Sequence, residues 1–169
     1  NLAAALAIRK HATLLIDLDP QSNSTMSFLD ARQLERTMFE AMIDEAVGLA
    51  GVIKASNVPY LSVAPARISL AKLEAKLVGE IDAHFRLRDR LDRVRQDYAS
   101  AILDCPPTLG LLTVNALVAA THLLIPIQSS YFALEGTDDL LETVDKVRAR
   151  ANPALKIIGV LITMHDRRT

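Results

Sequence analysis

The stretch that decides the fold is "LLIDLDPQSNST", residues 14–25. It begins as a continuously apolar run and reaches two acids, Asp17 and Asp19, which a proline and small polar residues follow. Unbroken apolar runs of this length are typical of strands that are buried on both faces of a parallel sheet. Proline and small polar residues favour turns and loops. The stretch therefore predicts a buried strand that ends on two carboxylates and continues into a loop.

Similar apolar runs recur along the chain and alternate with helical patterns. Strands are predicted at 12–17, 60–65, 99–104, 122–127 and 156–163. Helices are predicted at about 31–47, 69–95, 110–120 and 135–151, and a loop at 48–58. This alternation indicates an α/β fold, a mostly parallel sheet with helices on both faces. We interpret residues 1–169 as a single domain, and "NLAAALA" at its start as the back part of a helix, so we expect residues to precede Asn1.

Composition excludes few function classes. The 169 residues suffice for one domain with a sizeable core. A net charge of −1 gives no indication of binding to nucleic acid or to an acidic membrane. The single cysteine rules out an internal disulfide and favours a reducing compartment. No apolar run approaches the roughly 20 residues that span a bilayer.

Acidic residues at strand ends are the strongest chemical signal. In parallel α/β sheets, ligands bind beyond the carboxyl ends of the strands. The first predicted strand ends on Asp17 and Asp19, and the third ends in "ILDCPP" with Asp104. Such carboxylates suit a hydrated Mg²⁺, which takes one or two carboxylates together with waters and phosphate oxygens. An aspartate can also orient a water for attack on a phosphoryl group.

Plainer interpretations exist for these residues. A single strand-end aspartate is often a helix cap or a turn former. A receiver-type domain also gathers acids at strand ends, but it needs a lysine late in the sheet, and "LLIPIQSS" offers none. Cys105 has no evident histidine partner and is predicted to be a small buried hydrophobe. The histidines show no metal-ligand spacing, and we interpret all four as surface or loop residues: His11, His84, His122 and His165.

Five segments together carry a resemblance to a known family. They are "NLAAALA", "LLIDLDPQSNST", "AILDCPPTLGLLTVNAL", "LLIPIQSSYFALEG" and "IGVLITMHDRRT", in this order and across nearly the whole chain. The sequence resembles the ParA/Soj chromosome- and plasmid-partition ATPases of the MinD/ParA group, which are deviant Walker P-loop NTPases of the SIMIBI class. The combination of "DLDPQSN" with "DCPPTLGLLTVNAL" is far more specific than a lone glycine motif.

The resemblance implies a role for individual residues. Asp19 would position the attacking water, Asp17 would lie near the Mg²⁺ shell, and Asp104 would be the Walker B acid that holds Mg²⁺ through water. The remaining positions would belong to the two nucleotide-sensing switches and to the start of the adenine pocket: Pro20, Gln21 and Asn23, then Pro106 and Pro107, then Thr163 and Met164. The segment "SSYFALEG" would approach the dimer interface.

The sequence departs from the family in one large respect. It contains no KGGxGKT-type P-loop, whose backbone N–H groups and lysine bind the phosphates. In this family the strand before that loop lies inside the sheet, and it is missing as well. The end "TMHDRRT" also stops short of the elements that complete the adenine pocket and that supply basic residues. We therefore expect the 169-residue chain alone not to hydrolyse ATP, and to be marginally stable or prone to aggregation through two exposed strand edges.

For the parent protein, the resemblance implies an ATP-dependent dimer switch in DNA segregation. The ATP-bound homodimer would bind nucleoid DNA without sequence preference, and a ParB-type partner at a centromere-like site would stimulate hydrolysis. The protein would be cytoplasmic, nucleoid-associated and not membrane-bound. The basic pairs Arg148/Arg150 and Arg167/Arg168 are interpreted as solvated surface. Alternatives are a MinD-like regulator, a cargo-positioning ATPase and a degenerate interaction module without catalysis. An iron–sulfur carrier would need more than one cysteine.

Overall fold

The structure of the chain is a computed structural model that describes residues 1–128 and 132–164, with side chains between 132 and 150 described from residue 137 onward. The strands are β1 (Thr13–Asp17), β2 (Lys54–Ala55), β3 (Leu61–Ala64), β4 (Ser100–Asp104), β5 (His122–Gln128) and β6 (Lys156–Thr163). The α-helices are α1 (Leu2–Ile8), α2 (Asn23–Phe28), α3 (Met38–Ile43), α4 (Leu73–Leu77), α5 (Arg86–Asp92), α6 (Leu111–Ala119) and α7 (Phe132–Arg150). Short 3-10 helices are η1 (Ala31–Gln33), η2 (Ile68–Lys72), η3 (Ala83–Phe85) and η4 (Arg95–Asp97).

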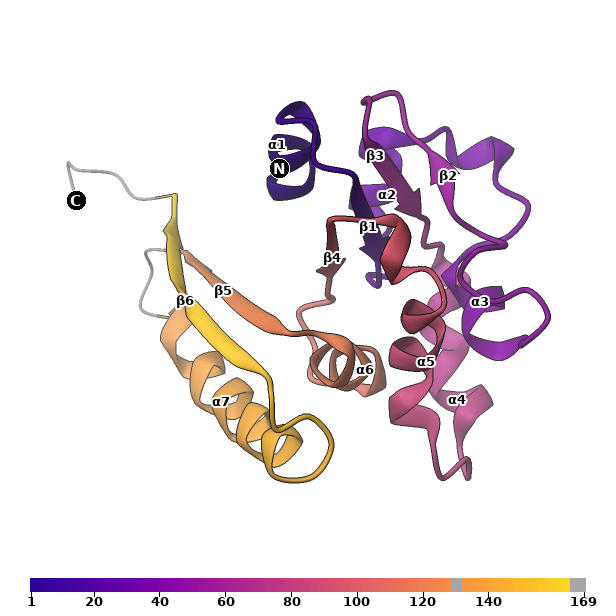
Figure 1. Cartoon of the computed structure of the whole chain (residues 1–169). Coiled ribbons are helices and arrows are strands. Elements are labelled where there is room, and N and C mark those ends of the chain that lie inside the picture. The colour runs from indigo at the N-terminus through magenta and orange to yellow at the C-terminus, as the bar shows by residue number, and fades with distance from the viewer. Residues whose placement is uncertain (129–131, 165–169) are drawn as a thin grey trace.

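Residues before α6 build a four-stranded sheet in the order β2-β3-β1-β4 (Figure 1). The strand β1 pairs in parallel with β3 on one side and with β4 on the other, while the short β2 pairs antiparallel with β3. The register aligns Thr13 with Ser100 at one end and Asp17 with Asp104 at the other. The predicted α/β class with a mostly parallel sheet is confirmed.

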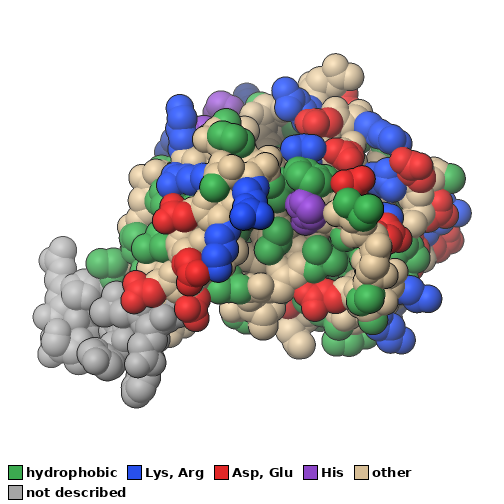
Figure 2. Space-filling view, turned by 90° about the horizontal axis from the view of Figure 1, so that it is seen from below, with side chains coloured by type: hydrophobic (Ala, Val, Ile, Leu, Met, Phe, Trp, Pro, Cys, Tyr) green, Lys and Arg blue, Asp and Glu red, His purple; other side chains and the backbone are tan. Residues whose placement is uncertain are grey.

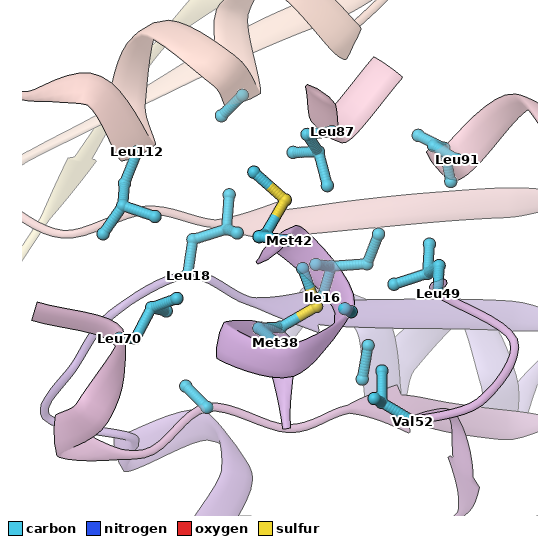
Figure 3. Packing of buried hydrophobic residues seen from close by; sticks show 14 of the residues in the cluster. Ile16, Leu18, Met38, Met42, Leu49, Val52, Leu70, Leu87, Leu91 and Leu112 are labelled. Atoms are coloured by element: carbon cyan, nitrogen blue, oxygen red, sulfur yellow. The ribbon is translucent and has the colours of Figure 1, made fainter. Parts of the chain in front are cut away.

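The strand β1 is buried along its whole length because both faces of the sheet are covered. Leu14 and Ile16 pack into a large core with α3, α5 and the start of α6 (Figure 3). Leu15 points to the opposite face, where it packs against Ala3 and Ala7 of α1. Successive side chains of a strand point to opposite faces, so an unbroken apolar run requires cover on both. The continuous run of residues 14–16 is explained by this arrangement.

The strands β5 and β6 form a separate parallel pair, against which α7 packs (Figure 1). Val144 and Val147 of α7 join Leu117 and Val118 of α6 in a core of their own. Within the described residues, β4 pairs only with β1 and β5 only with β6, so each keeps one unpaired edge. The sequence led us to expect one sheet that lacks an interior strand. The structure instead has two sheets, which α6 connects.

Two long predicted helices are broken in the structure. The prediction for 31–47 contains only η1 and the six-residue α3, because a capping box of Thr37 and Glu40 begins the helix at Met38. The prediction for 69–95 contains four short elements, η2, α4, η3 and α5. Gly79 has a φ of +88°, a left-handed conformation through which an α-helix does not continue. The predicted loop at 48–58 contains the short edge strand β2.

Among the described residues, no helix is both long and apolar enough to cross a membrane.

Candidate functional site

The ends of β1 and β4 bring two of the predicted acids side by side. Asp17 and Asp104 are register partners in the parallel ladder, and the backbone N–H of Leu18 donates to the Asp104 carbonyl at 2.8 Å. Asp17 is completely buried, whereas Asp104 is partly exposed. The two carboxylates therefore differ in environment although they occupy equivalent positions on adjacent strands.

The carboxylate of Asp17 is bonded on both oxygens. Its Oδ1 accepts the backbone N–H of Asp19 at 3.1 Å, and its Oδ2 accepts both the backbone N–H and the hydroxyl of Thr25 at 2.8 and 2.7 Å. Burial raises the pKa of Asp17 above its ordinary value and the negative charge of Asp104 adds to this rise, while the bonds from Thr25 and Asp19 act in the opposite direction. These bonds make Asp17 an anchor for the segment that follows β1.

The carboxylate of Asp104 accepts fewer hydrogen bonds than that of Asp17. The hydroxyl of Ser24 donates to Oδ2 at 2.5 Å, and no hydrogen bond from another described residue reaches Oδ1. Asp104 thus offers an oxygen to a ligand, as a residue that holds a hydrated cation must. The described residues contain no group of three or more His, Cys, Asp or Glu side chains that could hold a metal ion by themselves. The donor set therefore fits Mg²⁺ that also takes waters and phosphate oxygens, rather than a cation held by protein ligands alone.

The segment after β1 differs from the prediction, because "NSTMSF" is the helix α2 and not a loop. The true loop is short, and Asp19 organises it: its Oδ1 accepts the backbone N–H of Gln21 at 2.9 Å and its carbonyl accepts that of Ser22 at 2.8 Å. Ser22 lies in the left-handed region with a φ of +54°, and α2 begins at Asn23. Pro20 is half-buried, whereas the Gln21 and Asn23 side chains are exposed. The loop thus presents polar groups to solvent beside the acids.

Two residues of α2 complete the site, and neither was predicted from the sequence. Ser24 bonds Asp104 and Thr25 bonds Asp17, so adjacent residues of the first turn contact the two paired strand ends. Both residues belong to "SNST", which we interpreted as a polar loop. A signal was present, since Ser and Thr favour the first turn of a helix. The partner acid of Ser24 could not be assigned, because Asp104 lies 80 positions away.

The loop after β4 holds Pro106 and Pro107 next to the same site, with the first half-buried and the second exposed. It leads into α6 through a hydrogen bond from the Thr113 hydroxyl to the Thr108 carbonyl at 2.5 Å. Cys105 is an exposed residue, so the prediction of a buried hydrophobe is wrong. Local burial of its sulfur, helped by the charge of Asp104, nevertheless raises the pKa of Cys105 to about 12. The thiol is therefore protonated at neutral pH and is a weak nucleophile.

The structure does not bring the predicted adenine-pocket residues to this site. Thr163 ends β6, where it pairs with Gln128 and its hydroxyl donates to the Ile127 carbonyl at 3.3 Å. Met164 follows and is 80% exposed. The end of β6 lies apart from the ends of β1 and β4 in Figure 1. Their role in a nucleotide pocket stays a prediction.

The remaining sequence predictions concern the surface. His11 and His122 are exposed and His84 is half-buried in η3, while His165 and the Arg167/Arg168 pair lie outside the described residues. Arg150 is exposed, and Arg148 is half-buried with its Nε bonded to the Leu155 carbonyl at 2.9 Å. The side chains of "SSYFALEG", residues 129–136, all lie outside those that the structure describes.

Comparison with known proteins places the chain among nucleotide-binding proteins. A family model described as an AAA domain matches residues 1–157. The sporulation initiation inhibitor protein Soj of Bacillus subtilis is 44% identical over 170 residues, which cover 100% of this chain and 67% of Soj. The chromosome partitioning protein ParA of Myxococcus xanthus is also 44% identical, with 99% of this chain and 59% of ParA covered.

The solved structures agree on the fold. Cobyrinic acid a,c-diamide synthase from Mycobacterium smegmatis, with bound ADP and magnesium, is 34% identical and superposes with a TM-score of 0.93 over 99% of this chain and 68% of that protein. A plasmid partition protein from Borrelia burgdorferi superposes with a TM-score of 0.82 at 22% identity, which is similarity of fold alone. This chain thus spans 59 to 67% of the length of the two curated relatives above. From these matches and the fold, the chain belongs to the ParA/Soj family of P-loop NTPases.

Proposed function

We propose that the protein to which this chain belongs is an ATP-dependent switch for DNA segregation, and that the paired ends of β1 and β4 form the metal side of its nucleotide site. The observation that carries the proposal is the pairing of Asp17 with Asp104, with Ser24 and Thr25 of α2 bonded to them. The family membership and the ADP and magnesium bound in the M. smegmatis relative support it.

In this proposal each acid has its own role. Asp104, with one oxygen free of described hydrogen bonds, would hold Mg²⁺ through water. When bound, Mg²⁺ would neutralise developing charge on the phosphate oxygens. Asp19 would position the attacking water, because it lies in the loop beside the acids and remains partly exposed. Asp17 would fix the start of α2, since its oxygens already accept three hydrogen bonds. Any closer contact of Asp17 with the metal shell stays a prediction.

The phosphate-binding loop is not part of the sequence, and the sheet supports a place for it. The strands β4 and β5 each have an edge that no described strand pairs with. We propose that a strand of the whole protein pairs between them and leads into a P-loop beside Asp104. Such a strand would cover both edges, which are otherwise templates for aggregation.

The proposed partners follow from the family. ATP would close a homodimer in the cytoplasm, the dimer would bind nucleoid DNA, and a ParB-type protein would stimulate hydrolysis. The net charge of −1 gives no support for DNA binding by this segment, and on the face seen in Figure 2 Lys and Arg side chains are interspersed with Asp and Glu. We therefore propose that the DNA-binding residues lie outside the described part of the chain.

The test uses the natural protein, with its N-terminus determined by intact mass and peptide sequencing. Asp19→Ala should lower the rate of ATP hydrolysis by about 100-fold or more, as expected for loss of a group that positions the nucleophile. ATP binding and ATP-dependent dimerisation should persist. The matched control is Asp97→Ala, which removes an exposed acid of η4 that makes no described side-chain contact. Unchanged hydrolysis by Asp19→Ala, or no hydrolysis by the wild-type protein, would contradict the proposal.

A further inference from the structure

The side chain of Thr25 links Asp17 to a part of the chain far away in sequence. Its hydroxyl donates to Asp17 Oδ2 at 2.7 Å and accepts the backbone N–H of Ala66 at 2.8 Å. Thr25, Asp17 and Ala66 are all completely buried. A backbone N–H can only donate and an ionised carboxylate can only accept, so the direction of both bonds is fixed. The result is a chain from N–H through O–H to carboxylate, in which each bond polarises the next.

The residues around Ala66 form a corner between β3 and η2, which we define as Pro65–Arg67. Each residue of this corner bonds a different element. The Pro65 carbonyl accepts the backbone N–H of Met38 at the start of α3 at 2.7 Å. Ala66 bonds Thr25 of α2, and the Arg67 side chain donates to the Ala31 carbonyl in η1. The corner therefore holds one hydrogen bond to each of α2, α3 and η1, and helps to fix the position of all three.

From this geometry we infer that Thr25 is a positioning residue that couples the strand-end acid Asp17 to the Pro65–Arg67 corner. A change at Asp17, or a shift of the first turn of α2, is transmitted to the corner through the Thr25 hydroxyl. The corner is followed at once by Ile68, which begins η2 and is 69% exposed. A shift of the corner therefore changes the position of Ile68, an apolar side chain at the molecular surface. The coupling itself stands on these contacts, and its place in an ATPase cycle rests on the proposed function.

Hydrogen exchange of the Ala66 amide in the natural protein tests the coupling. Thr25→Val keeps the shape of the side chain and removes the hydroxyl, which should speed exchange at Ala66 by about tenfold because its bond is lost. Thr25→Ser keeps the hydroxyl and should stay within about twofold of wild type. Asp17→Asn removes the charge without touching Ala66, and it should speed the same exchange by about fivefold, since bonds to charged groups are the stronger ones.

Two comparisons separate coupling from a general loss of stability. Thr13→Val removes another completely buried hydroxyl, which bonds the His11 carbonyl at the opposite end of β1. It should leave Ala66 exchange within about twofold of wild type. The double variant Asp17→Asn/Thr25→Val should exchange no faster than Thr25→Val alone, because both changes break one path. Unchanged exchange at Ala66 in Asp17→Asn, or equal acceleration by Thr13→Val, would overturn the inference. If Thr25→Val does not fold, the comparison of Thr25→Ser, Asp17→Asn and Thr13→Val decides the matter alone.

A kinetic measurement connects the coupling to the proposed function. In the natural protein, Thr25→Val should lower kcat for ATP hydrolysis by about tenfold and leave KM within about twofold, with Thr25→Ser close to wild type. If KM changes and kcat does not, the positioning role is wrong. If the wild-type protein hydrolyses no ATP, the proposed function fails, while the exchange measurements still decide whether Thr25 couples the two segments.

Discussion

The two sheets of this molecule contain equally apolar strands in opposite environments. In β1 every residue is buried, and its side chains contact helices on both faces. In β6, Ile158, Val160 and Ile162 are 66%, 53% and 65% exposed, and Leu161 is 50% exposed. An unbroken apolar strand therefore shows that other elements must pack on both of its faces. It does not show that those elements belong to the same segment of chain. The site lies where the cover is complete, at the end of β1.

Core truncation should separate the two regions most strongly. Ile16→Ala in β1 removes a completely buried side chain and should lower the free energy of unfolding by about 2–5 kcal/mol. Ile162→Ala in β6 makes the same chemical change at an exposed position and should cost less than about 1 kcal/mol. Urea denaturation of both variants measures the difference. Equal losses would contradict the contrast between the two sheets.

The next largest effect on stability is expected from Asp17→Asn, and it depends on pH. Since burial raises the pKa of Asp17 in the folded state, the folded protein binds more protons there than the unfolded chain. Stability from this group is present below its ordinary pKa of 3.8 and is lost as the pH rises through the folded pKa. Asp17→Asn should therefore gain stability relative to wild type as the pH rises above about 4, by about 1.4 kcal/mol for each unit of pKa elevation.

Unfolding experiments in steps of pH from 4 to 7 measure this difference, with Asp97→Asn as the exposed control. A relative stability of Asp17→Asn that is constant or falls with pH would show that the carboxyl of Asp17 does not have a raised pKa.

The smallest effect is expected on the helix that covers β5 and β6. Glu142 and Lys146 of α7 form an ion pair at 2.6 Å with side chains that are 66% and 70% exposed. Exposed i,i+4 pairs contribute about 0.3–0.5 kcal/mol, and salt screens them. Glu142→Gln should shift the urea midpoint only slightly, and by less at a salt concentration well above physiological ionic strength, where the pair is screened. A loss above about 1 kcal/mol would mean that α7 depends on its surface charges.

The sequence predicts strands well in this chain because each strand is an unbroken apolar run. All five predicted strands are present within a residue or two of their predicted ends, and α6 and α7 lie where helices were expected. The breaks at Thr37 and Gly79 were missed because we followed hydrophobic periodicity and gave less weight to caps and left-handed glycines. Both the capping box and the glycine are local features that can be recognised in the sequence.

The contacts of the site were less predictable than its acids. Asp17, Asp19 and Asp104 could be selected because acids at strand ends are conspicuous in an apolar context. Thr25 bonds Asp17 only eight positions away, but Ser24 bonds Asp104 at a distance of 80 positions and Thr25 also bonds Ala66 at 41. No local pattern specifies the two distant pairings. The sequence likewise did not predict that β4 and β5 belong to separate sheets, because pairing between strands is a property of the folded sheet.

The most direct test of the central claim is the Mg²⁺ dependence of ATP binding by the natural protein and its Asp104→Asn variant, measured by calorimetry. If the paired strand ends are the metal side of the site, wild-type affinity for ATP should rise with Mg²⁺. Asp104→Asn should then lose most of this dependence, while Asp97→Asn keeps it. An Asp104→Asn variant whose ATP affinity responds to Mg²⁺ as strongly as that of the wild type would show that the metal site lies elsewhere.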